Sequence, residues 1–248
     1  MPKSRASNSS KQLVKSQQDV NSSPAWPTLK PLVPAVDLHL ETLLEDQIVV
    51  IYKFFTKALC QRYVSFLSNL PMVTTPGKPK KGEALRVNDR YQVHDPNFAK
   101  LLYESACLKD LIYRSPHYWG GQVLGLNPNI RIYRYTHGQF FAQHYDESNQ
   151  VLLGDTLAKR ARTTWTLLLY LTDPTTGCQG GETVFYPESG KFKNQSTQIQ
   201  TAPLIAVAPE LGMLLMHKHG DDCLLHEGKE VIAGEKWIIR TDLCVTRD

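Results

Sequence analysis

The run Gly138-Gln-Phe-Phe-Ala-Gln-His-Tyr-Asp146 ends in a His-x-Asp triplet, and the interpretation of the whole chain starts from it. Its aromatic residues and the preceding turn residue predict a β-strand over 138–145. Residues i and i+2 of a strand face the same way, so His144 and Asp146 can place one imidazole and one carboxylate on the same metal ion. The alternative is a pair of surface polar residues at a strand end, because such a triplet also occurs without a metal.

A third ligand is available in Leu224-Leu-His-Glu-Gly228, which contains His226. Two histidines and one carboxylate on one face of an octahedron leave three open positions, which is the arrangement of non-haem Fe(II) oxygenases. The open positions have room for a bidentate cosubstrate together with O₂. His144, Asp146 and His226 are therefore the candidate iron ligands.

The segment that follows His226 supplies cations suited to a dicarboxylic cosubstrate. In the strand predicted over 236–245, Lys236 and Arg240 share one face with Ile238. Either cation can hold the far carboxylate of such a cosubstrate, and arginine makes the better bidentate contact. The alternative for Lys236 is a solvated lysine at a strand end, the commoner state of this residue.

Secondary-structure signals divide the chain into a helical first part and a strand-rich second part. A strand is predicted over 47–54, and helices are predicted over 56–70, 95–102 and 108–113. From residue 126 onward, turn residues separate short strands, which are predicted over 129–135, 138–145, 163–171, 182–185, 204–208, 213–216 and 236–245. This order indicates an α+β, mostly β fold: a β-sandwich or jelly roll braced by N-terminal helices.

Composition and charge exclude several classes of function. The chain has 248 residues, and its formal net charge of +4, from 28 basic against 24 acidic residues, is too small to indicate a dedicated nucleic-acid binder. No apolar run reaches the length of a membrane span. The five cysteines are odd in number and form no Cys-x-x-Cys pair, which argues against a disulfide framework or a zinc ribbon.

Three regions are expected along the chain. Residues 1–35 are predicted to be a disordered tail followed by a proline-rich linker, because the tail is rich in serine and poor in apolar residues. Residues 36–125 are predicted to be a helical support and residues 126–248 the catalytic β core. No secretory signal is expected, so a cytoplasmic or nuclear location is predicted; a mitochondrial presequence is the alternative, since the tail is basic.

Together these motifs resemble the prolyl 4-hydroxylase-like family of iron(II)/2-oxoglutarate dioxygenases, particularly its fungal cytosolic or nuclear members. The resemblance covers about residues 48–242, and its matching runs are Arg131–Tyr135, Gly138–Asp146, Thr166–Leu171, Gly180–Thr183 with Phe185, and His226–Gly228 through Arg240–Asp242. It implies a double-stranded β-helix core, that is, a distorted jelly roll. It also implies hydroxylation of an unactivated C–H bond with release of succinate and CO₂, using Fe(II), 2-oxoglutarate, O₂ and L-ascorbate as reductant.

The resemblance implies a role for each candidate residue. An HxD pair and a distal histidine hold the iron, and here these are His144, Asp146 and His226. A basic residue ten positions after the distal histidine binds 2-oxoglutarate; it corresponds to Lys236, with Arg240 as a rival on the same face. A tyrosine upstream of HxD donates its hydroxyl to the cosubstrate. Tyr135 fits best and Tyr133 has the same strand parity, although packing within a sheet is the commoner use of tyrosine.

Two further groups of polar residues have alternative interpretations. Arg86, Asn88 and Arg90 recur at a spacing of two, which predicts either a polar strip at a substrate mouth or a solvated strand face. His217 and His219 alternate with a lysine and precede turn-forming residues. Their surroundings indicate an exposed loop, so they are not expected to be metal ligands.

The motifs leave the substrate open. A proline in a protein or peptide is the first hypothesis, and a small molecule or a methylated nucleobase is the second. A third hypothesis, from a different class, is a non-catalytic jelly-roll module that binds or senses a ligand. Retention of three metal ligands and two candidate cations argues against that third hypothesis.

Overall fold

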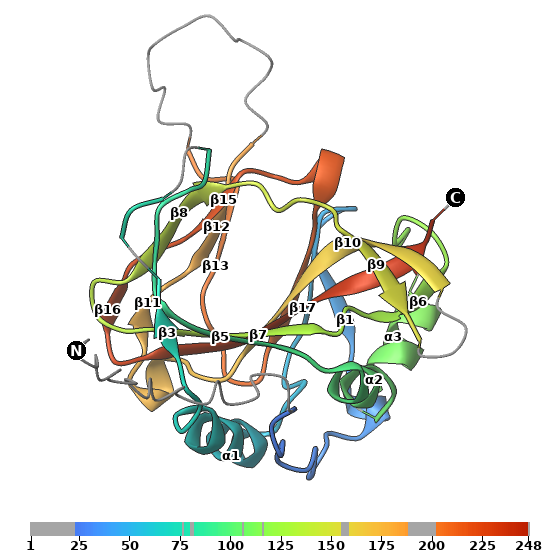
Figure 1. Cartoon of the computed structure of the whole chain (residues 1–248), viewed down its shortest axis with the longest axis horizontal. Helices are drawn as coiled ribbons and strands as arrows, with labels where there is room; N and C mark the ends of the chain where they lie inside the picture. The colour runs from blue at the N-terminus through green and yellow to red at the C-terminus, as the bar shows by residue number, and fades with distance from the viewer. Residues whose placement is uncertain are drawn as a thin grey trace, which may run out of the picture.

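The computed structural model describes residues 23–75, 77–79, 82–105, 107–115, 117–154, 159–187 and 202–247. Its strands form two antiparallel sheets that face each other, and its helices lie along the outer side of the larger sheet (Figure 1). This mostly β architecture with N-terminal helices is the one that the sequence predicts. Within these ranges, no helix has the length and apolar character needed to cross a membrane.

The larger sheet contains ten strands among the described residues. Eight of them lie in the order β1-β2-β14-β10-β17-β7-β5-β3, while β6 pairs with β17 and β9 pairs with β10. The bounds are β1 Leu40–Leu44, β2 Ile48–Ile51, β3 Val73–Thr74, β5 Asp89–His94, β6 Val123–Leu126, β7 Asn129–Tyr135, β9 Gln150–Leu153, β10 Lys159–Tyr170, β14 Leu214–Lys218 and β17 Lys236–Thr246.

The smaller sheet has the order β13-β12-β15-β8-β4, and a separate pair is formed by β11 and β16. The bounds are β4 Arg86–Val87, β8 Phe140–His144, β11 Gln179–Gly180, β12 Thr183–Phe185, β13 Ile205–Val207, β15 His226–Gly228 and β16 Val231–Ala233. Because β8 and β15 are neighbours, His144 lies directly opposite His226. The fold therefore brings together two histidines that are far apart in the sequence.

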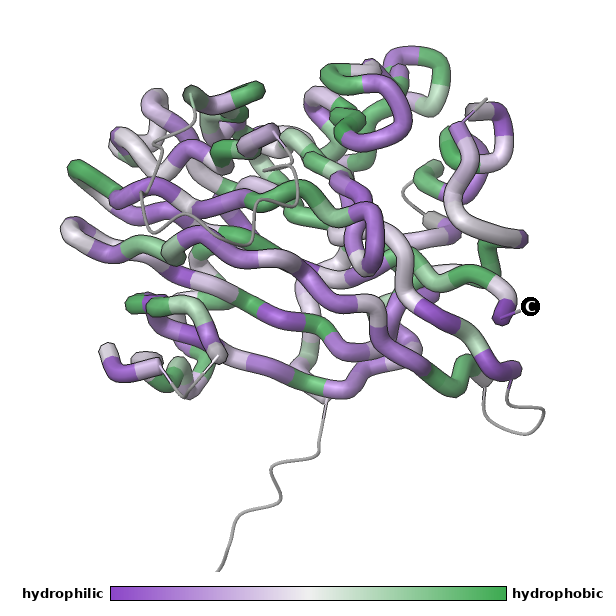
Figure 2. The backbone as a smooth tube through the Cα atoms, turned by 90° about the horizontal axis from the view of Figure 1, so that it is seen from above, coloured by the Kyte–Doolittle hydropathy of each residue, from purple (hydrophilic) through white to green (hydrophobic). Residues whose placement is uncertain are grey.

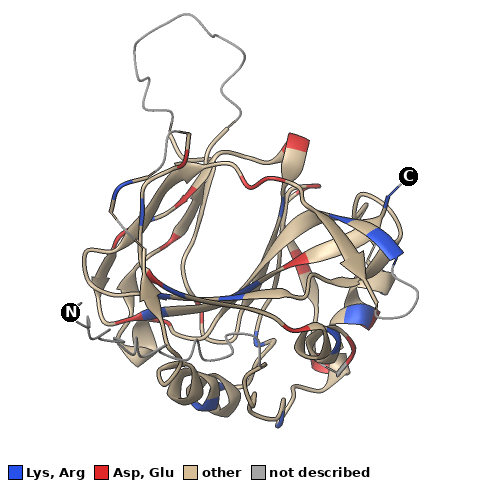
Figure 3. Ribbon diagram, in the orientation of Figure 1, with Lys and Arg blue, Asp and Glu red and all other residues tan. Residues whose placement is uncertain are grey.

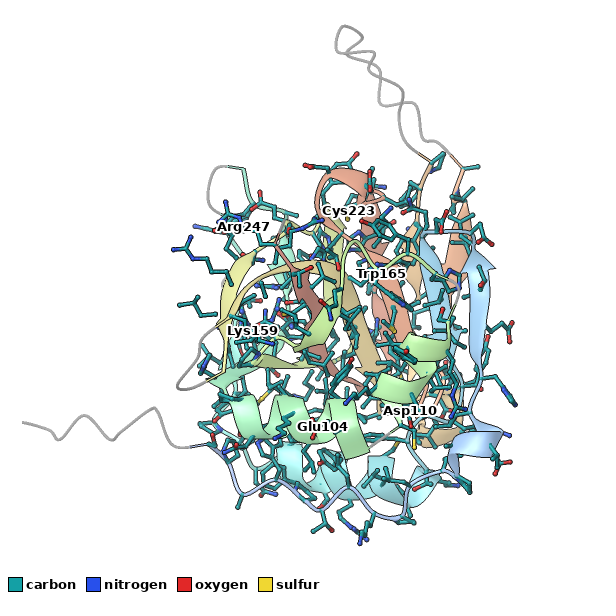
Figure 4. All side chains as sticks on the ribbon, turned by 90° about the vertical axis from the view of Figure 1, so that its right-hand side faces the viewer. Glu104, Asp110, Lys159, Trp165, Cys223 and Arg247 are labelled. Atoms are coloured by element: carbon teal, nitrogen blue, oxygen red, sulfur yellow. The ribbon has the colours of Figure 1, made fainter. Side chains whose placement is uncertain are left out.

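The helices begin where the sequence signals place them. Their bounds are α1 Lys57–Leu67, α2 Pro96–Ser105 and α3 Leu108–Arg114, with short 3-10 turns at Ala35–Asp37, Pro174–Thr176 and Gly220–Asp222. Thr56 caps α1 by accepting a hydrogen bond from the Leu59 amide at 3.2 Å. Figure 4 shows Glu104 and Asp110 on the helical layer, with Cys223 toward the opposite end of the molecule.

Alternation along the central strands produces two different cores. On β10, Trp165, Leu167 and Leu169 belong to the apolar core under the helices. Leu168 and Tyr170 point the other way and belong to the core between the sheets. Figure 2 shows the matching change between hydrophobic and hydrophilic residues along the strands. The inner face of the larger sheet is thus the surface on which a site can be built.

Residues 24–34, which the sequence assigns to a proline-rich linker, pack against the helices. Trp26 stacks on Phe98 with ring centroids 4.1 Å apart, and Leu29 is buried in the helix-side core. The Tyr63 hydroxyl donates to the carbonyl of Pro27 at 2.8 Å. The predicted disordered tail, residues 1–22, lies outside the described residues.

Candidate active site

Two imidazoles face each other at the open end of the smaller sheet. His144 ends β8 and His226 begins β15, and their ring centroids are 4.2 Å apart. The Nδ1 atom of each ring contacts the carbonyl oxygen two residues earlier, at 2.8 Å for His144 and 2.9 Å for His226. A carbonyl only accepts hydrogen bonds, so each Nδ1 carries the proton and each Nε2 keeps its lone pair for a metal ion.

Asp146 completes the predicted set of three ligands. The Nε2 atoms of His144 and His226 each lie 3.7 Å from a carboxylate oxygen of Asp146. The potential ligand atoms of the three residues lie within 4.8 Å of one another. Two nitrogen donors and one oxygen donor at this spacing suit a single ion of the Fe(II) type, so the residues present fit the metal that the sequence motifs imply.

The electrostatics of the three residues favour a positive charge between them. Burial alone would raise the pKa of Asp146, yet the nearby Arg240 guanidinium and the imidazoles hold it well below its usual range. Burial would lower the pKa of His226, but the nearby Asp146 carboxylate raises it to about 9. Burial and the neighbouring His226 lower the pKa of His144 to about 3. A metal ion bound between the three side chains would compete with protonation of His226 and would be attracted by the Asp146 carboxylate.

The Oδ2 atom of Asp146, which also faces His226, is held by two donors from the larger sheet. Arg240 on β17 contacts this oxygen at 2.9 Å, and the hydroxyl of Thr166 on β10 donates to it at 2.8 Å. Thr166 also lies 2.9 Å from Nδ1 of His219, and the other nitrogen of that ring lies 2.9 Å from Thr163. These contacts orient the carboxylate, as supporting groups around metal ligands commonly do.

His217 was missed, and the prediction of an exposed loop over 217–219 is wrong. β14 continues to Lys218, so His217 shares the inward face of Met213 and Leu215 and is 2% exposed. Its Nε2 lies 3.7 Å from Asp146 and has no hydrogen-bond partner among the described residues. Strand alternation from Met213 would have identified it, but the turn-forming residues after it suggested an earlier strand end.

Next to the three ligands lies a cavity of about 40 Å³ between the two sheets. Its wall includes both predicted tyrosines and both predicted cations: Tyr133, Tyr135, Lys236 and Arg240. Lys236 and Arg240 do share a face with Ile238, as strand parity predicts. The cavity therefore places the candidate cosubstrate residues beside the candidate ligands.

Lys236 lies in an aromatic enclosure at one end of this cavity. Its Nζ lies 5.6 Å from the ring centroid of Tyr135 and 5.4 Å from that of Tyr170, and it donates to the carbonyl of Gly181. Tyr170 was missed by the sequence argument, and its hydroxyl lies 2.6 Å from the hydroxyl of Thr183. Among the described residues, Lys236 has no carboxylate within ion-pair distance. Its charge is thus available to a ligand, whereas that of Arg240 is taken by Asp146.

The predicted polar strip is only partly present. Arg86 on β4 and Arg90 on β5 both lie beside the ring of Tyr133, at 5.7 and 5.9 Å from its centroid. Asn88 is instead fully buried, and its backbone N–H donates to the Thr75 hydroxyl at 3.0 Å. The two arginines are therefore near the cavity, and Asn88 supports the backbone between them.

Two sequence comparisons match this chain to known proteins. Residues 130–241 match the family model of the 2OG-Fe(II) oxygenase superfamily. Prolyl 4-hydroxylase 2 of Arabidopsis thaliana is 33% identical over 122 residues, which are 44% of this chain and 38% of that protein. The similar part thus spans less than half of this relative's length.

Two solved structures with low sequence identity share the fold. One is a prolyl hydroxylase from Trichoplax adhaerens in complex with a hypoxia inducible factor oxygen degradation domain peptide fragment; its TM-score is 0.51 at 18% identity, with coverage of 80% of this chain and 83% of that one. The other is HygX from Streptomyces hygroscopicus with nickel and 2-oxoglutarate bound; its TM-score is 0.52 at 16% identity, with coverage of 81% and 83%. The predicted jelly-roll fold is confirmed.

Proposed function

We propose that the chain is an Fe(II)- and 2-oxoglutarate-dependent dioxygenase of the prolyl 4-hydroxylase-like type, because residues 130–241 match the 2OG-Fe(II) oxygenase superfamily model and 122 residues are similar to a prolyl 4-hydroxylase. One observation carries this proposal. The ligand atoms of His144, Asp146 and His226 converge beside a cavity that also contains a buried lysine without a carboxylate partner among the described residues. The fungal origin suggested by the sequence stays a prediction.

Each residue has a defined part in this proposal. His144, Asp146 and His226 hold Fe(II), and Arg240 with Thr166 keeps the Asp146 carboxylate in place. Fe(II), when bound, would supply the redox chemistry that couples decarboxylation of 2-oxoglutarate, with release of succinate and CO₂, to hydroxylation of an unactivated C–H bond.

The cosubstrate end of the cavity is assigned to a second group of residues. Lys236 binds the far carboxylate of 2-oxoglutarate, because it is the cation whose charge Asp146 does not use. Tyr135 and Tyr170 enclose the lysine and exclude water from the salt bridge. Tyr133 forms the adjoining wall of the cavity.

The substrate that we propose is a prolyl residue in a protein or peptide. Support comes from the prolyl 4-hydroxylase relative and from the structural neighbour solved with a peptide fragment. We also propose L-ascorbate as the reductant, because the resemblance to the prolyl 4-hydroxylase-like family implies it. A cytoplasmic or nuclear location is supported by the five cysteines, which are all free thiols.

Removal of one ligand tests the metal and cosubstrate assignment. Under anaerobic conditions, Fe(II) and 2-oxoglutarate together should give the protein a visible charge-transfer band. Asp146→Ala should abolish this band and reduce succinate formation by at least about a thousandfold, because the carboxylate ligand is lost. Arg160→Gln, an exposed substitution on β10, is the matched control and should retain both.

The same assay then identifies the substrate class. Succinate formation is measured with proline-containing peptides, free amino acids and methylated oligonucleotides, and we expect the peptides to stimulate it. Full turnover by the Asp146→Ala protein would contradict the metal site. Stimulation by oligonucleotides alone would favour nucleobase demethylation, and an unchanged protein that binds neither Fe(II) nor 2-oxoglutarate would favour the non-catalytic module.

A further inference from the structure

Two guanidinium groups beside the cavity are not used by the proposed iron and cosubstrate sites. These are Arg86 and Arg90, here called the arginine pair. Arg86 lies 4.9 Å from the ring centroid of Phe141, and Phe141 stacks on His144 with centroids 3.6 Å apart. Phe141 and Tyr133 both line the cavity. Arg86 is therefore separated from a proposed iron ligand by a single aromatic ring, and Arg90 lies beside the adjoining ring of Tyr133.

No acid among the described residues compensates the charges of the arginine pair. In the part of the chain that the structure describes, neither guanidinium forms an ion pair with a carboxylate. The adjacent Asp89 is taken by Arg134 at 2.6 Å, and Glu227 on the cavity wall contacts Lys229 at 2.7 Å. The Nε of Arg90 is buried and has no hydrogen-bond partner among the described residues. A buried donor of this kind is costly unless a ligand satisfies it.

The ring of Tyr133 lies in the combined field of these cations. Burial alone would raise the pKa of Tyr133, but four surrounding arginines lower it: Arg240, Arg131, Arg90 and Arg86. Two of the four have acidic partners, since ion pairs join Arg240 to Asp146 and Arg131 to Asp242. Figure 3 shows basic residues on the neighbouring strands β5, β7 and β17. The uncompensated part of the field belongs to the arginine pair.

Iron and cosubstrate would not neutralise this excess. In the proposed complex, Fe(II), Lys236 and Arg240 together have four positive charges, whereas Asp146 and 2-oxoglutarate have three negative charges. The arginine pair then keeps both of its charges for the remaining ligand of the site, which is the substrate.

The backbone between the two arginines is held in a defined position. The Thr75 hydroxyl donates to the Arg86 carbonyl at 3.0 Å and accepts from the Asn88 amide at 3.0 Å. These contacts hold the connection between β4 and β5, the strands of Arg86 and Arg90, in one conformation. The backbone therefore loses less conformational entropy when an anion binds.

We infer that the arginine pair binds a carboxylate of the substrate, so that the substrate of this site is an acid. This inference rests on the proposed function and narrows its substrate class. Two guanidinium groups gain strong charge-assisted hydrogen bonds from a carboxylate, and a neutral amide in the same place cannot replace them. The carboxylate belongs either to an acidic residue of a peptide or to a small carboxylic acid.

Binding is tested on the full chain loaded with Zn(II) and 2-oxoglutarate, since Zn(II) has no redox activity and binding is then read without turnover. Isothermal titration compares two matched pairs of probes. The peptide pair is acetyl-Gly-Pro-Glu-amide and acetyl-Gly-Pro-Gln-amide; the small-molecule pair is N-acetylproline and N-acetylprolinamide. We expect the acid of one pair to bind at least about tenfold more tightly than its amide. The pair that shows this preference identifies the source of the carboxylate.

Substitutions then assign the preference to the arginine pair. The double variant Arg86→Gln, Arg90→Gln should bind acid and amide within about twofold of each other and retain the affinity for 2-oxoglutarate. Arg160→Gln removes one exposed charge elsewhere on the molecule and should leave the preference unchanged. Thermal unfolding curves check that each variant is folded.

Several outcomes would overturn the inference. They are equal binding of acid and amide by the unchanged protein, no measurable binding of either acid, and a preference that survives the double substitution. A failure of the proposed function gives a different result. The wild-type protein would then bind no 2-oxoglutarate in the presence of Zn(II), regardless of its affinity for the acid probes.

Discussion

The two faces of strand β10 serve different purposes. Outward residues such as Trp165 and Leu167 pack into the apolar core under the helices. Inward, the Thr166 hydroxyl holds the Asp146 carboxylate at 2.8 Å, and Leu168 lines the cavity. Neighbouring residues of one strand thus contribute either to stability or to the site, and the alternation of the strand keeps the two contributions apart.

The energetic contrast between these faces is large. Apolar burial on the outer face stabilises the sheet at roughly 25 cal/mol for each Å² removed from water. The inner face borders buried charges, including Asp146, Arg240 and Lys236, whose removal from water opposes folding. The outer face therefore stabilises a fold that has to tolerate a polar cavity.

Leu167 and Leu168 give the sharpest test of this separation, since they are adjacent in sequence and lie on opposite faces. Leu167→Ala should lower the free energy of unfolding by about 2–5 kcal/mol, because it leaves a void in a close-packed core. Leu168→Ala should cost less stability, because this side chain already borders a cavity, and it should weaken 2-oxoglutarate binding more. Urea denaturation and 2-oxoglutarate titration measure the two effects, and equal effects of both substitutions on both measurements would refute the separation.

Within the inner face, Lys236 and Arg240 are expected to differ in function. Lys236→Ala should weaken 2-oxoglutarate binding by about tenfold to a hundredfold, since a charge-assisted contact is lost. Arg240→Ala should weaken 2-oxoglutarate less and metal binding more, because Asp146 loses the partner that orients it. Separate titrations with the metal and with 2-oxoglutarate distinguish the two variants. The reverse order of 2-oxoglutarate affinities would move the anchoring role to Arg240.

The pH dependence of Lys236 gives the smallest effect and has opposite signs in two measurements. Burial lowers the pKa of Lys236 from 10.5 to about 8. The folded chain then binds fewer protons than the unfolded chain between these values, so the contribution of Lys236 to stability rises as the pH increases through that range. The affinity for 2-oxoglutarate should instead fall above pH of about 8, because the positive charge is lost.

Lys236→Met is the matched control for this titration. Its affinity for 2-oxoglutarate should be weak and should not change between neutral and alkaline pH. At neutral pH this variant should have a higher melting temperature than the wild-type protein, because it buries no charge at position 236. The difference in melting temperature should shrink as the pH rises. Parallel pH curves for the two proteins, in either measurement, would show that Lys236 does not titrate in this range.

Much of this architecture can be predicted from local sequence patterns. The strand predicted over 129–135 is β7 without any change of bounds, and the Thr56 cap begins α1 as predicted. The convergence of His144, Asp146 and His226 could be inferred because metal chemistry restricts which residue types act together. Strand parity also placed Lys236 and Arg240 on a common face.

Features that depend on distant contacts were not predictable in the same way. Whether Lys236 or Arg240 has a free charge depends on where Asp146 lies relative to β17. His217 was assigned to a loop because turn-forming residues follow it, although the pairing of β14 with β10 and β2 extends the strand. The prolines of residues 24–34 suggested a linker, whereas Trp26 and Leu29 attach this segment to the helices.

The contact between Lys236 and the Gly181 carbonyl couples the evolution of positions 181 and 236. A Cβ atom at Gly181 would lie 2.9 Å from Cδ of Lys236, and the backbone there has φ of +73°. Any larger residue at position 181 would displace the lysine and strain the chain. Natural variants of this protein should therefore keep glycine at 181 for as long as they keep lysine at 236, and loss of the lysine would relax selection on the glycine only in part.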